Sequence, residues 1–176
     1  PEPLNRVAAS QAGIVTWEQA LASGMPAKTV CRLVRDGYWT WLAPAIYLTH
    51  ALMPGWSSLV WAGALAGGPE AAITGKAALR LDSVIEDEDL PIPILLPFAA
   101  GYRPASNWWS FSRTRTPFRS IGEVRRVRIE RVVLDPAPSR RDGRRQSQML
   151  EVVLRQVIQD QRDLAVPPLA LDQRPQ

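Results

Sequence analysis

The sequence is poor in the residues from which most catalytic and metal sites are built. Its 176 residues include one cysteine, Cys31, and one histidine, His50. One cysteine cannot form an intrachain disulfide framework, and one histidine cannot supply a multi-histidine metal site or a relay of histidines. The Gly67-Gly68 pair lacks the lysine of a phosphate-binding Walker loop. We therefore expect no enzymatic activity, no cofactor and no bound metal.

Long apolar runs are also missing. No segment reaches the roughly 18 uninterrupted apolar residues of a membrane span. We recognise no secretory leader, although the sequence does not begin with Met. These features, with the single cysteine, favour a cytoplasmic protein that does not bind membranes. The net charge of +4 and the pI of about 9.8 favour an anionic partner.

The first residues carry signals for two helices. Leucine, valine and alanine recur at helical spacing over residues 4–12, and Gly13 is a natural stop. Thr16 and Gln19 then fit a capping box, in which the Thr16 hydroxyl accepts from the backbone of Gln19 and the Gln19 amide reaches back. A second helix is therefore expected over residues 17–22.

A third helix should follow after a tight turn. Gly24 suits a left-handed turn position, where a side chain would cost energy. Pro26 suits the first turn of a helix, because its missing N–H would have no partner there anyway. Gly37 fits the C-terminal cap of that helix.

The third helix separates into an apolar and a cationic face. Four aliphatic residues share one side, with Cys31 at its edge: Ala27, Val30, Leu33 and Val34. The other side carries three cations with two polar residues on the flank: Lys28, Arg32, Arg35, Thr29 and Asp36. Such a helix can dock on a core and offer its cations to DNA phosphates or base edges. We predict that Lys28, Thr29, Arg32 and Arg35 contact DNA. The alternative is an ordinary solvated helix.

A hairpin is expected directly after this helix. Residues 38–42 and 46–49 are rich in aromatic and β-branched residues, and residues 43–45 form the turn. Strict alternation would place Trp39 and Trp41 on one face of the first strand. Helix, turn, helix and hairpin in this order describe a winged helix-turn-helix, which places its short basic helix in a DNA groove.

These segments resemble the N-terminal domain of AbiEi-type antitoxins, the bacterial regulators of type IV toxin–antitoxin systems. The resemblance spans residues 8–84. It rests on Gln11–Thr16, Gly24-Met25, Leu33–Gly37, Leu42–Tyr47 and the two stretches Trp61–Pro69 and Ala72–Leu79, which are similar to a helix pair in actinobacterial members. It implies a DNA-binding autorepressor, with a cognate toxin as a possible partner. The glycine of the family's wing tip is replaced in Pro44-Ala45-Ile46-Tyr47.

The remainder predicts a small mixed α/β domain. We expect three domains or segments: residues 1–50, the winged helix-turn-helix; residues 51–162, the α/β domain; and residues 163–176, a flexible tail. We expect three helices here. The first begins at Trp56 and stops at Gly67-Gly68-Pro69, the second runs from an N-cap at Thr74 to Leu81, and the third spans residues 145–160. We also expect three strands. Residues 91–97 form an edge strand because of their prolines. Residues 108–114 place Trp109, Phe111 and Arg113 on one side, and residues 124–129 place Val127 and Ile129 facing one way.

Charges are unevenly distributed in this second region. The run Glu86–Asp89 holds four carboxylates, which we interpret as a solvated linker rather than a calcium site, because the ligand spacing is missing. Residues 103–145 contain twelve arginines against four acidic residues. We predict that arginines on the strands and their loops follow the DNA backbone: Arg113, Arg115, Arg125, Arg126 and Arg128. Composition alone, or a surface for a partner protein, could also account for them.

The expected fold class is therefore α+β. The expected function is a DNA-binding transcriptional regulator, an autorepressing antitoxin that binds double-stranded DNA of its own promoter. The alternative is a protein-interaction module that neutralises a toxin or precedes a nuclease-like domain absent from this chain.

Overall fold

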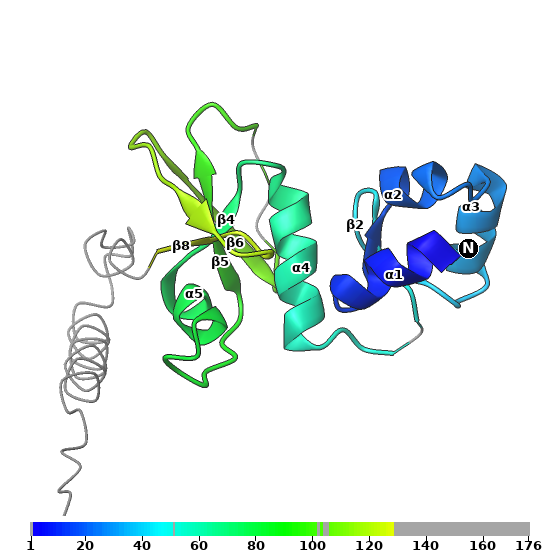
Figure 1. Cartoon of the computed structure of the whole chain (residues 1–176), viewed down its shortest axis with the longest axis horizontal. Coiled ribbons are helices and arrows are strands. Elements are labelled where there is room, and N and C mark those ends of the chain that lie inside the picture. The colour runs from blue at the N-terminus through cyan, green and yellow to red at the C-terminus, as the bar shows by residue number, and fades with distance from the viewer. Residues whose placement is uncertain (1, 51, 102, 104–105, 129–176) are drawn as a thin grey trace, which may run out of the picture. The chain divides into compact units, whose positions relative to one another are not determined.

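The described part of the chain is a mixed α and β structure. A computed structural model describes residues 2–50, 52–101, 103 and 106–128, all within a compact unit that spans residues 1–132. These described residues form five helices and two β-sheets (Figure 1). The expected α+β class is confirmed at this level. The expected boundaries at residues 50 and 162 stay predictions.

The first six elements enclose one small core. They are α1 Glu2–Ser10, β1 Ile14–Thr16, α2 Trp17–Ala22, α3 Ala27–Arg35, β2 Thr40–Ala43 and β3 Ile46–Leu48. The strands form an antiparallel sheet in the order β1-β3-β2. The buried core is drawn from both helices and strands: Leu4, Ala8, Val15, Ala20, Val30 and Trp39. Because no element can bury its apolar face alone, α3 is held by packing against the others.

The local signals around α2 and α3 are confirmed. The Thr16 hydroxyl accepts from the Gln19 backbone N–H at 3.1 Å, and the Gln19 side chain accepts from the Thr16 backbone N–H at 2.8 Å. Gly24 and Gly37 have φ values of 84° and 77°, in the left-handed region that glycine adopts without strain. The turn between the helices is therefore set by residues within the segment itself.

Removing the Thr16 hydroxyl should destabilise the protein measurably. Thr16→Ala leaves the Gln19 backbone N–H in the first turn of α2 without its side-chain acceptor, so we expect the free energy of unfolding to fall by about 1 kcal/mol. Thr16→Ser keeps the hydroxyl and should retain most of that stability. Urea denaturation followed by circular dichroism measures both. Equal losses in the two variants would contradict a capping role.

Three expectations in this segment are wrong in detail. The first helix spans Glu2–Ser10 rather than 4–12, and β1 was not expected at all. The first hairpin strand begins at Thr40 instead of Tyr38. Trp39 is buried whereas Trp41 is 57 % exposed, so the two indoles do not share a face. Trp39 precedes the strand, and its backbone N–H donates to the Leu33 backbone oxygen at 3.0 Å. The backbone there does not follow the alternation of the strand, and the side chain lies in the core.

The other elements form a five-stranded mixed sheet with two helices. They are α4 Trp56–Gly67, β4 Ala72–Ile73, α5 Gly75–Leu81, β5 Ile92–Pro97, β6 Trp109–Thr114, β7 Ser120–Ile121 and β8 Arg126–Val127. The strand order is β6-β5-β4-β8-β7, and β5 runs parallel to β6 over its whole length. The predicted helices at 56–67 and 74–81 and the strand at 108–114 are confirmed. Thr74 occupies the N-cap position of α5 but makes no side-chain capping bond.

Helix α4 lies very close to the β5–β6 pair. A Cβ at Gly63 would lie 2.5 Å from Trp109 Cδ1 and 2.7 Å from Ile94 Cδ1, closer than real Cβ contacts allow. The Trp109 indole fills the space that this glycine leaves, and its Nε1 donates to Leu59 O at 2.8 Å. Glycine at position 63 thus sets the distance between the helix and the sheet.

The interpretation of residues 91–97 as an edge strand is wrong, because β5 lies between β6 and β4. The Ile92 N–H donates to Trp108 O, toward β6, and backbone donors alternate in direction along a strand. Pro93 and Pro97 therefore turn their nitrogens toward β4. β4 pairs with β5 through Ala72 and Ile73, opposite Leu95 and Ile94, and the Pro93 carbonyl still accepts from the Thr74 backbone N–H at 3.0 Å.

The strand expected over residues 124–129 is shorter than predicted. Within residues 124–128, which the structure describes, the strand is Arg126–Val127, because the residues before it form the turn of a β7–β8 hairpin. Val127 is buried, as expected. The predicted facing of Ile129, the helix over 145–160 and the tail over 163–176 lie outside the described residues.

Candidate nucleic-acid interface

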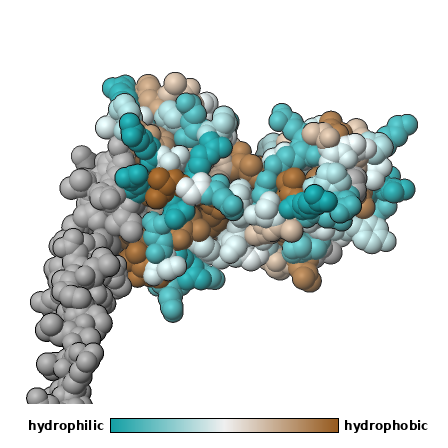
Figure 2. Space-filling view, viewed as in Figure 1, coloured by the Kyte–Doolittle hydropathy of each residue, from teal (hydrophilic) through white to brown (hydrophobic). Residues whose placement is uncertain are grey.

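Helix α3 presents three cations on one exposed face. Lys28, Arg32 and Arg35 are all exposed, and their spacing of three and four residues places them along one side of the helix. We call these three residues the α3 cations. In the view of Figure 2, hydrophilic side chains project from the surface around this helix. The predicted exposure of this face is confirmed.

The opposite side of α3 is anchored as expected, with one exception. Val30 is fully buried, and Leu33 and Val34 are half-buried against the same core. Ala27 was expected on the apolar side but is exposed at the first turn of α3. Thr29 is half-buried at the flank. The helix can therefore offer its cations without losing its own support.

The α3 cations differ in their electrostatic surroundings. Arg35 Nε donates to Asp36 Oδ1 at 2.9 Å, an exposed pair that screens part of its charge. Neither Lys28 nor Arg32 forms an ion pair within the described part of the chain. Cys31 is exposed beside them, and the pKa of Tyr47, which packs on the same core, is raised by burial and, to a lesser extent, by the negative charge of the Cys31 thiolate. Lys28 and Arg32 therefore carry the uncompensated charge of this face.

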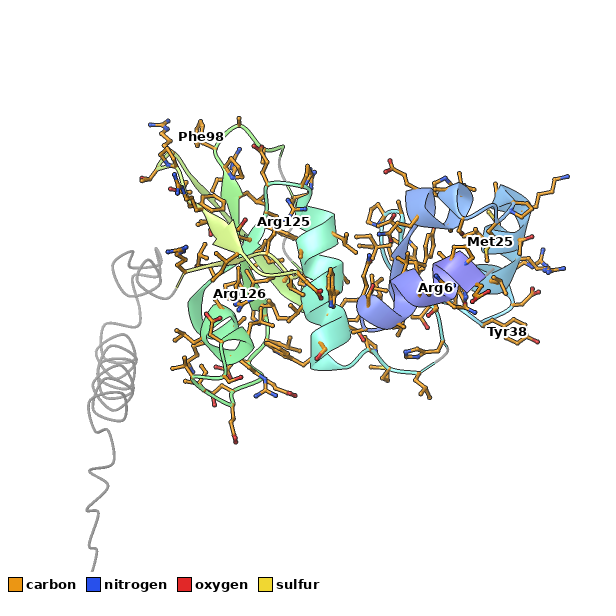
Figure 3. The ribbon with its side chains drawn as sticks, in the orientation of Figure 1. Arg6, Met25, Tyr38, Phe98, Arg125 and Arg126 are labelled. Atoms are coloured by element: carbon orange, nitrogen blue, oxygen red, sulfur yellow. The ribbon has the colours of Figure 1, made fainter. Side chains whose placement is uncertain are left out.

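Two exposed aromatic residues flank the β2–β3 hairpin. Tyr38 is 66 % exposed and points away from the body of the fold (Figure 3), and Trp41 on β2 is also largely exposed. The hairpin turn at Pro44-Ala45 places Ala45 at a φ of 61°, in the left-handed region that favours glycine. The pairing of β2 with β3 is irregular between Trp41 and Ala43, which strict strand alternation does not predict.

The predicted arginines of the second sheet lie near the end of β6 and near β8, in different surroundings. Arg113 and Arg115 lie at the end of β6, with guanidinium carbons 5.5 Å and 4.4 Å from the centre of the Phe98 ring. Arg125 and Arg128 are exposed near β8. Arg126 is different, because its Nε donates to Asp82 Oδ1 at 2.6 Å in a partly buried pair. Arg126 thus has a structural partner that the sequence pattern did not indicate.

Arg126 should matter more for stability than its neighbour Arg128. The side chains of Arg126 and Asp82 are only 21 % and 14 % exposed, so Arg126→Gln deprives a partly buried carboxylate of its charged donor. We expect a loss of about 1–3 kcal/mol in the free energy of unfolding. Arg128→Gln removes an exposed charge and should cost less than about 0.5 kcal/mol. Chemical denaturation of the two variants would contradict this assignment if they were equally stable.

The acidic run is exposed and lies outside helices and strands, as expected of a solvated linker, but it is also attached to α5. Lys76 Nζ donates to Asp89 at 2.9 Å and to Asp87 at 3.0 Å, and these hydrogen bonds raise the pKa of Lys76. Arg80 donates to Glu88 at 2.5 Å and to the backbone oxygen of Glu86. Long basic side chains of one helix thus hold the run in place, which spacing along the chain does not predict.

Metal-binding clusters and membrane-spanning helices are both absent from the described residues. These residues contain no group of three or more His, Cys, Asp or Glu side chains that could hold a metal ion. No helix in the same residues has the length and apolar character to cross a membrane. The prominent chemical features are therefore exposed cations and aromatic rings. The chain matches no protein-family model, and no curated protein shows significant similarity to it.

Proposed function

We propose that this protein is a DNA-binding transcriptional regulator whose residues 2–49 act as a winged helix-turn-helix. The observation that carries the proposal is α3, a short helix with its aliphatic side in the core and Lys28, Arg32 and Arg35 exposed together. The order α1-β1-α2-α3-β2-β3 and the antiparallel sheet β1-β3-β2 support it. A helix of this kind fits the width of the DNA major groove.

In this proposal the three α3 cations make different contacts with DNA. Arg32 lies mid-helix without an ion pair, and a guanidinium there can bind a guanine edge through two hydrogen bonds. Lys28, in the first turn, suits a phosphate contact, and half-buried Thr29 can add a hydroxyl bond at the flank. Arg35 shares its charge with Asp36 and suits a phosphate at the rim. In this proposal the β2–β3 hairpin is the wing and lies over the neighbouring backbone.

The resemblance to AbiEi-type antitoxins supports a more specific form of the proposal. A regulator of this kind represses its own promoter from the cytoplasm, and its DNA partner is the duplex upstream of its own gene. A cognate toxin would be a second partner. In the second sheet, Arg113, Arg115, Arg125 and Arg128 are exposed and can add sequence-independent contacts, whereas Arg126 is engaged with Asp82.

One observation favours the alternative of a protein-interaction module. Tyr38 and Trp41 are large, exposed aromatic residues, and such residues are enriched in protein–protein interfaces. In this version α3 and the hairpin would bind a toxin rather than DNA. The two versions differ in their dependence on salt, because DNA binding releases counterions from phosphates.

Fluorescence anisotropy with two labelled duplexes tests the proposal. One duplex carries the protein's own upstream sequence, and the other has the same composition in shuffled order. We expect binding to the upstream duplex to be tighter by roughly a thousandfold or more, with an affinity that falls as salt rises. Equal affinities, or no binding to either duplex, would refute a sequence-specific regulator and leave the interaction module.

A further inference from the structure

Two arginines share one phenylalanine ring at the end of the β5–β6 pair. Phe98 directly follows β5, and its backbone N–H donates to Thr114 O at 2.8 Å, so the pairing of the two strands continues by one residue. The guanidinium of Arg115 lies 4.4 Å from the ring centre and that of Arg113 lies 5.5 Å from it. The ring itself is 50 % exposed, and Figure 3 shows it at the rim of the sheet.

Helix α4 covers one face of the sheet but ends before it reaches this cluster, which lies on the same face. Leu96 pairs in register with Arg113 and is buried beneath the last residue of α4, Gly67. Side chains two residues apart on a strand project to the same face, so Phe98 lies one step beyond Leu96 on the face that α4 covers. The helix ends at Gly67. The Phe98 ring and the two guanidinium groups therefore occupy the next, exposed part of that face.

The positive charge of this cluster is uncompensated. Residues 90–122 contain no aspartate or glutamate, and neither Arg113 nor Arg115 forms an ion pair with any residue that the structure describes. The nearest acidic run in sequence, Glu86–Asp89, is bound to Lys76 and Arg80 through its Asp87, Asp89 and Glu88 side chains. Two like charges held near one another without a counterion favour an anionic ligand.

We infer that Phe98, Arg113 and Arg115 form a phosphate clamp that binds the DNA backbone. Planar guanidinium groups match phosphate oxygens through paired N–H donors, and an aromatic ring beneath them restricts their motion before binding. Phe98 is thus a positioning residue, and the arginines make the contact. The clamp rests on the proposed function and deepens it. In addition to the contact made by α3, it supplies a contact that does not depend on the DNA sequence.

The salt dependence of DNA binding tests the clamp. The variant Arg113→Gln/Arg115→Gln should lower the slope of log affinity against log salt by about 2 between roughly 50 and 200 mM salt, equally for upstream and shuffled duplexes. Phe98→Leu keeps both charges and should weaken binding roughly two- to fivefold, the equivalent of one exposed cation–π contact. Arg6→Gln is the control: it removes an exposed arginine that has a carboxylate partner, and it should leave the slope unchanged.

The outcomes separate the clamp from the proposed function. If the wild-type protein binds the upstream duplex and the double-arginine variant keeps its slope, the clamp is wrong and the α3 function stands. Such a result would assign the cluster to an acidic protein segment instead. If the wild-type protein binds neither duplex, both proposals are overturned together. Circular dichroism melting curves should be alike for all these variants, because each altered side chain is exposed or half-exposed.

Discussion

The double variant Lys28→Ala/Arg32→Ala should lose roughly a hundredfold or more in affinity for the upstream duplex. If Arg32 binds a base edge, its removal alone should cost about 1–3 kcal/mol of specific binding. Loss of the Lys28 phosphate contact should add to this and reduce the salt slope by about 1. Both side chains are exposed and without ion pairs among the described residues, and alanine is the best helix former, so the fold should be retained. Anisotropy titrations measure the affinity, and circular dichroism measures the fold.

A matched control for this variant is Arg6→Ala. Arg6 is an exposed arginine on α1, paired with Glu2 at 2.9 Å, and it belongs to the same small core unit but not to α3 (Figure 3). Its removal should change the affinity less than about threefold, because exposed ion pairs contribute little. An unchanged affinity in the double variant, or an equal loss in the Arg6 variant, would mean that α3 is not the recognition helix.

Trp109→Ala should destabilise the second sheet more than any other single change considered above. The indole lies against Gly63 and Ile94 and donates to Leu59 O, so its removal leaves a large cavity between α4 and β6. We expect the free energy of unfolding to fall by about 3–5 kcal/mol. Guanidinium denaturation followed by circular dichroism measures the loss, and a value below about 1 kcal/mol would contradict the packing described.

Trp41→Ala is the control for this prediction. It removes the same side chain from a position that is 57 % exposed, so little buried surface is lost and the cost should stay below about 1 kcal/mol. Gly63→Ala adds a further check, because its Cβ would force Trp109 or α4 to move. An overpacked core of this kind typically costs about 1–3 kcal/mol.

The two proposed DNA contacts would supply different parts of the binding free energy. The α3 cations can discriminate between sequences, because a base edge in the major groove has a distinct pattern of donors and acceptors. The clamp of Phe98, Arg113 and Arg115 would bind any duplex, because every phosphate is alike. Variants of α3 should therefore lower the ratio of upstream to shuffled affinity. Variants of the clamp should lower both affinities and leave the ratio unchanged.

The sequence by itself determined the features that depend on near neighbours in the chain. The Thr16–Gln19 capping box, the left-handed Gly24 and Gly37, and the end of α4 at Gly67-Gly68 are all as predicted. Each of these signals acts over only a few residues. The two faces of α3 were predictable for the same reason, because a regular helical period relates residues three and four apart.

Only the tertiary structure decided which strands meet and which charges find partners. β1 has three residues, too few for a periodic signal, and it is stable because it pairs with β3. β5 is an inner strand despite its prolines, because it pairs with β6 on one side and with the short β4 on the other. Arg126 meets Asp82 and Lys76 meets Asp89 across stretches of chain that no local pattern connects. Pairing and burial depend on residues distant in sequence, and for that reason the surface role of each arginine had to be read from the fold.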